Sequence, residues 1–242
     1  MNGFLKSHSI INEYPINYNI FPFSKKVKFY EIELNAGEFL VIPKLWLHWI
    51  ESEADTVAFS FLISEITYYF DCNIINSISK NSIFYKGKHI IDFHLDKFLD
   101  NNIDNFYNLY LSKNKDVSPV YKLNSKIKSR IHNIQLKNVL NIFKKQPNIF
   151  AYIGMNEVDK ENSFYKIPNF DNINFDNILK YKTFLWMNLK NKINSGLHFD
   201  LDHSILFVVH GKKKVLLTNP CNKKFLYITP LNKIDFINQN EL

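Results

Sequence analysis

The sequence predicts a mainly β fold with added helices, and three observations support this prediction. Short apolar runs, some alternating with polar residues as in half-buried strands, occur near both ends of the chain. The middle of the chain carries apolar residues at helical spacing. Hydrophobic residues make up 46 % of the 242 residues and aromatic residues 16 %, which is enough for a sizeable core and excludes global disorder.

The first part of the chain, residues 1–65, is expected to be β structure. Apolar and polar residues roughly alternate in its first candidate strand, and the turn sequence Asn35–Glu38 separates that strand from the next. Pro43 ends the second strand, and a third buried run follows. The candidate strands are Lys26–Leu34, Phe39–Ile42 and Thr56–Ile63.

The middle part, residues 66–146, is expected to be a helical block packed on one side of a sheet. Apolar residues recur at helical spacing over Leu95–Leu111 and Ile127–Phe143, with Lys and Asn between them. No low-complexity linker separates this block from its neighbours. We therefore expect residues 1–242 to form a single domain.

The last part, residues 147–242, returns to strand patterns. Gly196 and Gly211 mark turns between its apolar runs. The candidate strands are Phe150–Ile153, Thr183–Leu189, Ser204–Val209 and Lys213–Leu217.

Charge and cysteine content restrict the class of protein. The net charge of +7 permits contacts with nucleic acid or acidic partners but does not require them. Cys72 and Cys221 cannot form a disulfide framework, and no Cys-x-x-Cys pair indicates a zinc ribbon. Polar residues throughout Met1–Phe23 and the lack of a long apolar run lead us to expect neither a signal peptide nor a membrane-spanning helix. A cytoplasmic protein without a membrane partner is expected.

One motif indicates metal chemistry. His198 and Asp200 are two residues apart in a strand-like region, so an imidazole and a carboxylate would point to the same face. One further histidine would complete the two-His-one-carboxylate triad that holds non-haem Fe(II). His94 and Asp96 have the same spacing, but their helical pattern makes positions i and i+2 diverge, which favours a surface pair.

Two longer runs resemble the JmjC-type and cupin-like oxygenases, which depend on Fe(II) and 2-oxoglutarate. Residues 37–52 (GEFLVIPKLWLHWIES) are similar to the segment that carries the last iron ligand in that family: a turn glycine, a buried strand ending in Ile-Pro, an aromatic residue and a histidine. The resemblance makes His48 the third metal ligand. Residues 198–220 (HFDLDHSILFVVHGKKKVLLTNP) resemble the family's first-ligand segment.

The resemblance also implies the fold and a cosubstrate site. It implies a double-stranded β-helix, or jelly-roll, with helices packed outside. Lys213 falls where the family pairs a lysine with the distal carboxylate of 2-oxoglutarate, and on a strand it must face away from its two lysine neighbours. Ser195 and Tyr152 match positions with a similar role. Ser60 lies where some relatives have an asparagine near the cosubstrate.

The order of the two halves differs from the family. Residues 1–65 resemble its C-terminal half with the distal histidine, and residues 147–242 resemble its first half. We expect a circularly permuted jelly-roll, because the termini of such folds can lie close together. A homodimer that exchanges halves and an incomplete piece of a tandem array are the two alternatives.

The function expected from this resemblance is an Fe(II)- and 2-oxoglutarate-dependent oxygenase. It would be a hydroxylase that acts on side chains of a protein or peptide substrate, with His198, Asp200 and His48 as metal ligands. Nucleic acid is the alternative substrate, and the protein would then be an RNA-base hydroxylase. The alternative from another class is a non-catalytic, cupin-like binding or scaffold protein, or an incomplete half-domain of a larger assembly.

Overall fold

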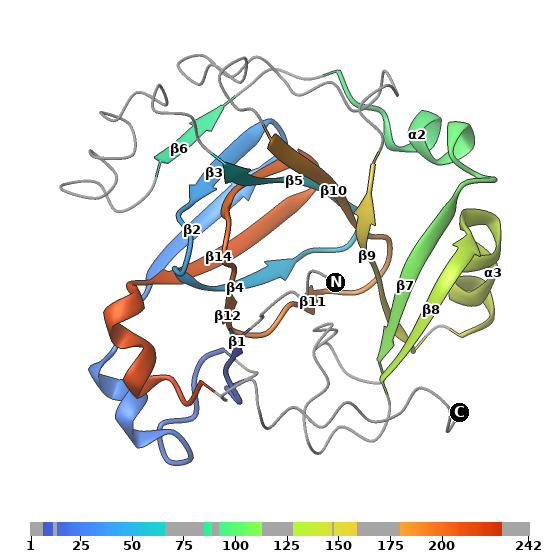
Figure 1. Cartoon of the computed structure of the whole chain (residues 1–242). Helices are drawn as coiled ribbons and strands as arrows, with labels where there is room; N and C mark the ends of the chain where they lie inside the picture. Colours follow the sequence, from blue (N-terminus) through green and yellow to red (C-terminus); the bar gives the residue numbers. More distant parts are fainter. Residues whose placement is uncertain are drawn as a thin grey trace.

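A computed structural model describes residues 7–11, 14–65, 85–88, 92–112, 128–146, 148–158 and 180–228. Two antiparallel sheets dominate it (Figure 1). The smaller sheet has the order β1-β12-β4-β14-β2, with β11 also paired to β4. Its strands are β1 (Ser7–His8), β2 (Tyr30–Asn35), β4 (Leu47–Ser52), β11 (Ile193–Asn194), β12 (His198–Phe199) and β14 (Lys212–Thr218).

The larger sheet has the order β6-β3-β13-β5-β10-β9-β7-β8. Its strands are β3 (Glu38–Ile42), β5 (Thr56–Glu65), β6 (Tyr85–Lys88), β7 (Phe106–Ser112), β8 (Lys128–Gln135), β9 (Phe150–Glu157), β10 (Lys180–Asn188) and β13 (His203–His210). The prediction of a mainly β jelly-roll with added helices is confirmed.

The two halves of the chain interleave in both sheets. In the run β12-β4-β14-β2, strands from after residue 180 alternate with strands from before residue 65. The run β3-β13-β5-β10 alternates in the same way. Within these two runs, each strand is therefore hydrogen-bonded to strands from the other half of the sequence, and both halves are needed to form them.

Strand alternation separates an inner face from an outer face. On β5, Val57, Phe59 and Phe61 pack in an apolar cluster on the outer face of the larger sheet, called here the outer cluster. Ala58 packs in a second apolar cluster between the two sheets, the inner cluster. The inner cluster is otherwise aliphatic, and its buried members are Ile32, Leu34, Leu40, Ile42, Ala58, Leu206, Val208, Val215 and Leu217. The space between the two sheets is thus lined in large part by aliphatic side chains.

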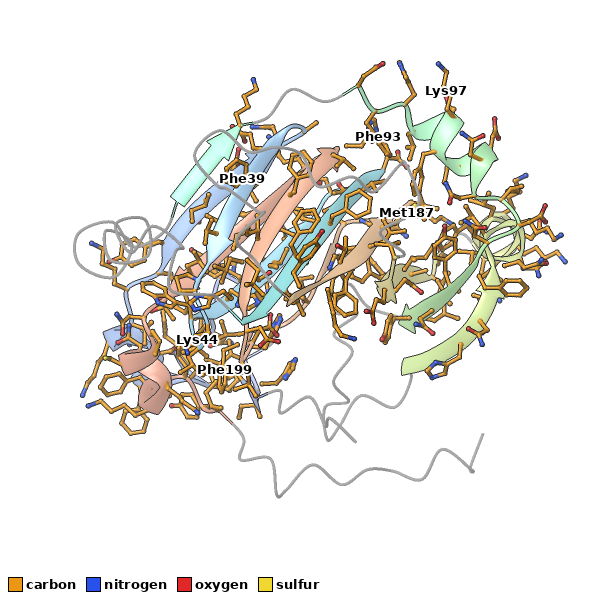
Figure 2. The ribbon with its side chains drawn as sticks, turned by 45° about the horizontal axis from the view of Figure 1, so that its top comes forward. Phe39, Lys44, Phe93, Lys97, Met187 and Phe199 are labelled. Carbon is orange, nitrogen blue, oxygen red and sulfur yellow. The ribbon has the colours of Figure 1, made fainter. Side chains whose placement is uncertain are left out.

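The outer face of the larger sheet is covered by α2 (Leu95–Asn101) and α3 (Leu136–Lys145). Phe98 of α2 and Leu136 and Val139 of α3 are buried in the same cluster as the outward residues of the sheet. Figure 2 labels three members of this cluster, Phe39, Phe93 and Met187. The expectation that helices pack on one side of a sheet is confirmed for these two helices.

The extent of the expected helices was wrong. The run Leu95–Leu111 contains only α2 and then strand β7, and the run ending at Phe143 contains β8 before α3. Phe106–Leu111 is rich in aromatic residues, which favour strands, and β7 gains ladders to both β8 and β9. Tertiary pairing overrode an apolar spacing that also fitted a helix. Residue 127, the predicted start of the second helix, lies outside the described residues.

The early and late parts of the chain meet on the outer face of the smaller sheet. A 3₁₀ helix over Pro22–Lys26 packs near a second one over Pro220–Phe225. A β-bridge joins Ser9 to Ile228, and the Ile10 amide donates to the carbonyl of Tyr227 at 3.3 Å. An apolar cluster shared by both segments covers this face.

Candidate metal centre

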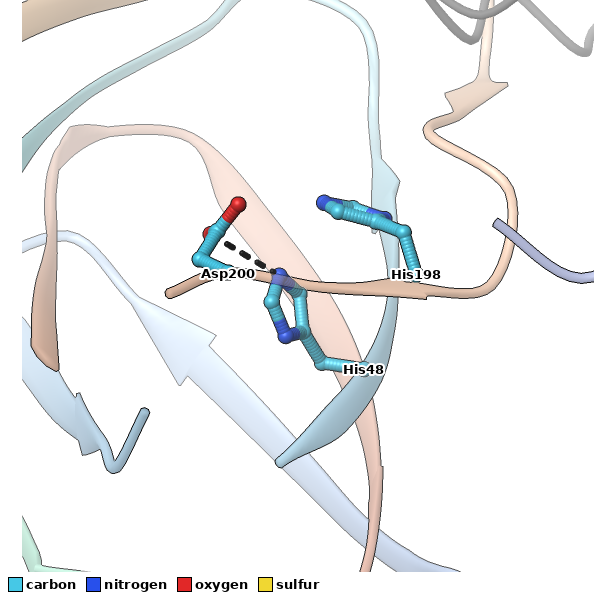
Figure 3. Close-up of side chains that lie close together, drawn as sticks. All are labelled: His48, His198 and Asp200. Carbon is cyan, nitrogen blue, oxygen red and sulfur yellow. Dashed lines mark ion pairs between the residues drawn. The ribbon is translucent and has the colours of Figure 1, made fainter. Parts of the chain in front are cut away.

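The three predicted ligands lie together at one end of the smaller sheet (Figure 3). Backbone register places His198 of β12 directly opposite His48 of β4, and Asp200 follows β12 immediately. His48 Nε2 lies 3.6 Å from Asp200 Oδ2, and the candidate ligand atoms of all three residues lie within 4.8 Å of one another. Residues more than 140 positions apart in sequence meet because the two halves interleave.

Backbone carbonyls fix the orientation of both imidazoles. His48 Nδ1 lies 3.0 Å from the carbonyl oxygen of Trp46, and His198 Nδ1 lies 3.0 Å from that of Gly196. A carbonyl can only accept, so each Nδ1 donates to it, and Nε2 is the nitrogen that each imidazole can direct at a metal ion. Such outer contacts are what orient histidine ligands in metal sites.

The donor set fits a non-haem Fe(II) ion. Two neutral imidazole nitrogens and one carboxylate form the facial triad that leaves coordination positions open. His48 is buried, with 3 % of its side chain exposed, whereas Asp200 keeps 24 % exposure. The group is therefore accessible from one side and walled by protein on the other.

Lys213 is a buried cation on the inner face of the same sheet. Its residue exposure is 1 %, and Nζ donates to Ser52 Oγ at 2.5 Å and to Tyr152 OH at 3.3 Å. The neighbouring lysines point the other way, Lys212 to Glu33 at 3.4 Å and Lys214 to Glu31 at 2.6 Å. The strand alternation inferred from sequence is what the structure shows.

Burial sets the electrostatics around Lys213. It lowers the pKa of the Lys213 ammonium to about 7. It also raises the pKa of the Tyr152 hydroxyl, against the opposing effect of a hydrogen bond with Ser52. No carboxylate of the described residues pairs with Lys213. A buried ammonium without an anionic partner is costly, so the surroundings of Lys213 suit an incoming anion.

An indole group lies beside Tyr152, one of the hydrogen-bond partners of Lys213. Trp186 of β10 stacks on Tyr152, with ring centroids 5.8 Å apart and planes at 22°. Its Nε1 is buried and makes no hydrogen bond within the described part of the chain. Gly154 permits this arrangement, because a Cβ there would lie 2.9 Å from the Trp186 ring. The Lys213 ammonium and the hydroxyls of Ser52 and Tyr152 together fit a carboxylate group.

The remaining predicted residues are placed less directly. Ser195 is half-buried, and its hydroxyl accepts from the Ile50 amide at 3.2 Å and donates to the Gly196 carbonyl at 3.2 Å. It shows no hydrogen bond to Lys213. Ser60 is buried on β5, on the same face as Ala58, and no hydrogen bond of its side chain is present among the described residues.

Sequence reasoning missed Ser52. It follows His48 by four residues on β4, so both side chains face the interior, and it lies opposite Lys213 in the register of β4 and β14. The signal was present, because an even spacing from a predicted ligand on a strand places a residue on the ligand's face.

Comparison with known proteins identifies the family. The chain matches the model of the cupin-like domain over residues 4–72 and 77–240, so it belongs to the cupin-like, JmjC-related family. It is 26 % identical over 228 residues to the putative JmjC domain-containing protein L887 of Acanthamoeba polyphaga mimivirus. That alignment covers 88 % of this chain and 37 % of the relative. The resemblance to this family inferred from the two motif runs is confirmed.

A second relative matches a shorter segment. JmjC domain-containing protein C of Dictyostelium discoideum is 40 % identical over 50 residues, which is 21 % of this chain and 12 % of that protein. The chain thus spans well under half the length of the curated relatives it matches. No solved structure matches. Neither described helix combines the length and the apolar character needed to cross a membrane.

Proposed function

We propose that the protein is an Fe(II)- and 2-oxoglutarate-dependent oxygenase, and that the reaction it catalyses is a hydroxylation. One observation carries the proposal: the group of His48, His198 and Asp200 lies on the inner face of the same sheet as Lys213. The Lys213 ammonium is buried and pairs with no carboxylate of the described residues. The family's enzymes combine these two features. A structural metal site alone would not need the buried cation.

The residues divide into two binding groups. His48, His198 and Asp200 would hold Fe(II), and Lys213 with Tyr152 and Ser52 would bind the distal carboxylate of 2-oxoglutarate. His48 and Ser52 are four residues apart on β4, about 13 Å at 3.3 Å per residue. A cosubstrate that contacts both groups must be elongated and anionic at its far end. Ser195 and Ser60 are proposed as further cosubstrate-binding residues.

The bound iron and cosubstrate would supply dioxygen activation and insertion of one oxygen atom into a C–H bond, with 2-oxoglutarate converted to succinate and CO₂. This chain's contribution is to orient and to exclude water. The Trp46 and Gly196 carbonyls hold the imidazoles, and Lys213 supplies a charge-assisted bond. Apolar side chains of the inner cluster, among them Ile50 and Val215, lie between the two groups along β4 and β14.

The proposed substrate is a protein or peptide side chain. This part rests on kinship with cupin-like and JmjC domains alone. An RNA base is the competing substrate, and a non-catalytic binding protein is the competing class. Succinate formation in the presence of peptide or of RNA pools distinguishes these possibilities.

The test is turnover of 2-oxoglutarate. Anaerobically purified protein is loaded with Fe(II), exposed to O₂, and assayed for succinate with and without peptide or RNA pools. We expect succinate from the native chain and at least a hundredfold less from Asp200→Ala and from Lys213→Met. Lys212→Met, which alters a solvent-facing lysine of the same strand, should retain activity. Succinate formation that persists in Asp200→Ala, or is absent from the iron-loaded native chain with every pool, would contradict the proposal.

A further inference from the structure

A third histidine extends the row of metal ligands. Backbone register places His8 of β1 opposite His198 of β12, and His198 opposite His48 of β4. Directly opposed residues of antiparallel strands project from the same face, with Cβ atoms about 4.5–5.5 Å apart. His8, His198 and His48 therefore form one cross-strand row, and His198 lies at its centre.

The ring geometry shows that His8 is not placed as a fourth ligand. The rings of His8 and His198 are nearly parallel, 7° apart with centroids 4.9 Å from each other, whereas the His48 ring is tilted by 60°. An ion bound to an imidazole lies in the plane of that ring, so two rings stacked in parallel planes cannot both direct a nitrogen at one ion. The compact group of ligand atoms comprises His48, His198 and Asp200 without His8.

We infer that His8 is a positioning residue, which holds the ring plane of His198 in the orientation that metal binding needs. The inference rests on the proposed metal site. The Gly196 carbonyl holds one edge of the His198 ring, at Nδ1, but a contact at an edge still permits the plane to rock. The His8 ring packs flat against the face of the His198 ring, which opposes that motion, and His8 is itself buried, with 3 % of the residue exposed.

The strand that carries His8 is itself held on both sides. The Ser9 amide donates to the Leu197 carbonyl at 2.8 Å, and Ser9 Oγ donates to the Leu226 carbonyl at 2.5 Å. The first bond joins β1 to the strand of His198, and the second joins it to the late segment of the chain. β1 thus covers the edge of β12 and keeps the His8 ring in register with the ligand.

The test uses Co(II) as a metal probe, titrated anaerobically, with affinity and ligand-field absorption as readouts. His8→Phe keeps a flat ring without a nitrogen, and His8→Leu keeps apolar volume without a flat face. We expect His8→Phe to bind within about threefold of the native chain with the same spectrum. His8→Leu should bind about tenfold more weakly, with a changed spectrum, as for other residues that orient metal ligands. His132→Leu, a histidine of β8 in the other sheet, is the matched control and should behave as the native chain.

Three results would overturn the inference. Native affinity in His8→Leu would show that stacking is unnecessary. Equal losses in His8→Phe, His8→Leu and His198→Ala would show that His8 ligates the metal. A loss in His132→Leu equal to that in His8→Leu would show that the effect is not specific to the row. These results are distinct from failure of the proposed oxygenase function, because Co(II) binding that depends on His198 can exist without turnover. Thermal unfolding of each metal-free variant verifies that it is folded.

Discussion

Lys213 is the residue at which folding and function oppose each other. Its neighbours Lys212 and Lys214 form ion pairs on the outer face, while Lys213 places its ammonium among Ser52, Tyr152 and the inner apolar cluster. Because burial lowers the folded-state pKa to about 7, the unfolded chain binds more protons between pH 7 and about 10. This group therefore makes stability rise with pH across that window. A buried lysine that lowers the stability of the folded protein is consistent with a role of Lys213 in anion binding.

The same pKa predicts the pH dependence of cosubstrate binding. The distal carboxylate of 2-oxoglutarate needs the protonated ammonium, and the protonated fraction of the free protein falls about tenfold per pH unit above pH 7. Affinity should be constant below about pH 6.5 and weaken by up to tenfold per unit above pH 7. Calorimetry on the Fe(II)-loaded protein measures this, with Lys214→Met as the control that keeps the dependence. An affinity that does not change from pH 6.5 to 8.5 would rule out Lys213 as the anchor.

At the scale of elements, the turn after β10 is fastened to the end of β4 by a single side chain. Asn188 is fully buried, and its Nδ2 donates to the carbonyls of Glu53 and Asn191, both at 2.7 Å, and of Ser52 at 3.3 Å. Its Oδ1 accepts from the Lys190 amide at 3.3 Å. The contact joins strands from the two halves next to the residue that holds Lys213.

Replacing this side chain should be costly. Asn188→Leu leaves buried backbone groups without their partner, and we expect a loss of about 2–4 kcal/mol in the free energy of unfolding. Asn35→Ala removes an exposed asparagine side chain and should cost about 0.5 kcal/mol or less. Urea unfolding of both variants gives the comparison. Equal small losses would show that Asn188 does not fasten the turn.

Strands were easier to predict from the sequence than helices. Buried runs such as Ser204–Val209 are short, rich in β-branched residues and followed by a turn glycine, which favours strands, and they became strands. Residues 95–111 carry a spacing compatible with a helix, yet the second part became β7 because β8 and β9 were available to pair with it. His8 had no local signal at all. Its importance arises from a register that only the folded sheet reveals.

At the scale of the whole molecule, the interleaved halves decide where the site can form. The motif runs predicted His48 and His198 as partners, but the sequence could not show whether one chain supplies both. The structure brings them together within a single chain, through β4 and β12. A circularly permuted jelly-roll remains our interpretation of the order of the halves, and a homodimer that exchanges halves is the arrangement to test against it.

Mixing two defective variants distinguishes these arrangements. His48→Ala and Asp200→Ala each lose one ligand from a different half, and equal amounts are unfolded and refolded together. A site complete within one chain predicts no recovery of Fe(II) binding in the mixture. A swapped homodimer would combine intact halves from the two variants and restore about a quarter of the sites. Metal stoichiometry after gel filtration distinguishes the two, and recovery near that fraction would favour exchange.

The most direct test of the central claim is an anaerobic titration of 2-oxoglutarate into metal-free and Fe(II)-loaded protein. The claim is that His48, His198 and Asp200 hold the metal while Lys213 binds the far end of the cosubstrate. We expect one 2-oxoglutarate per chain, bound at least tenfold more tightly with Fe(II) than without, and this gain lost in Asp200→Ala. Lys213→Met should bind Fe(II) normally yet lose 2-oxoglutarate. Binding that is indifferent to Fe(II), or that survives Lys213→Met unchanged, would contradict the claim.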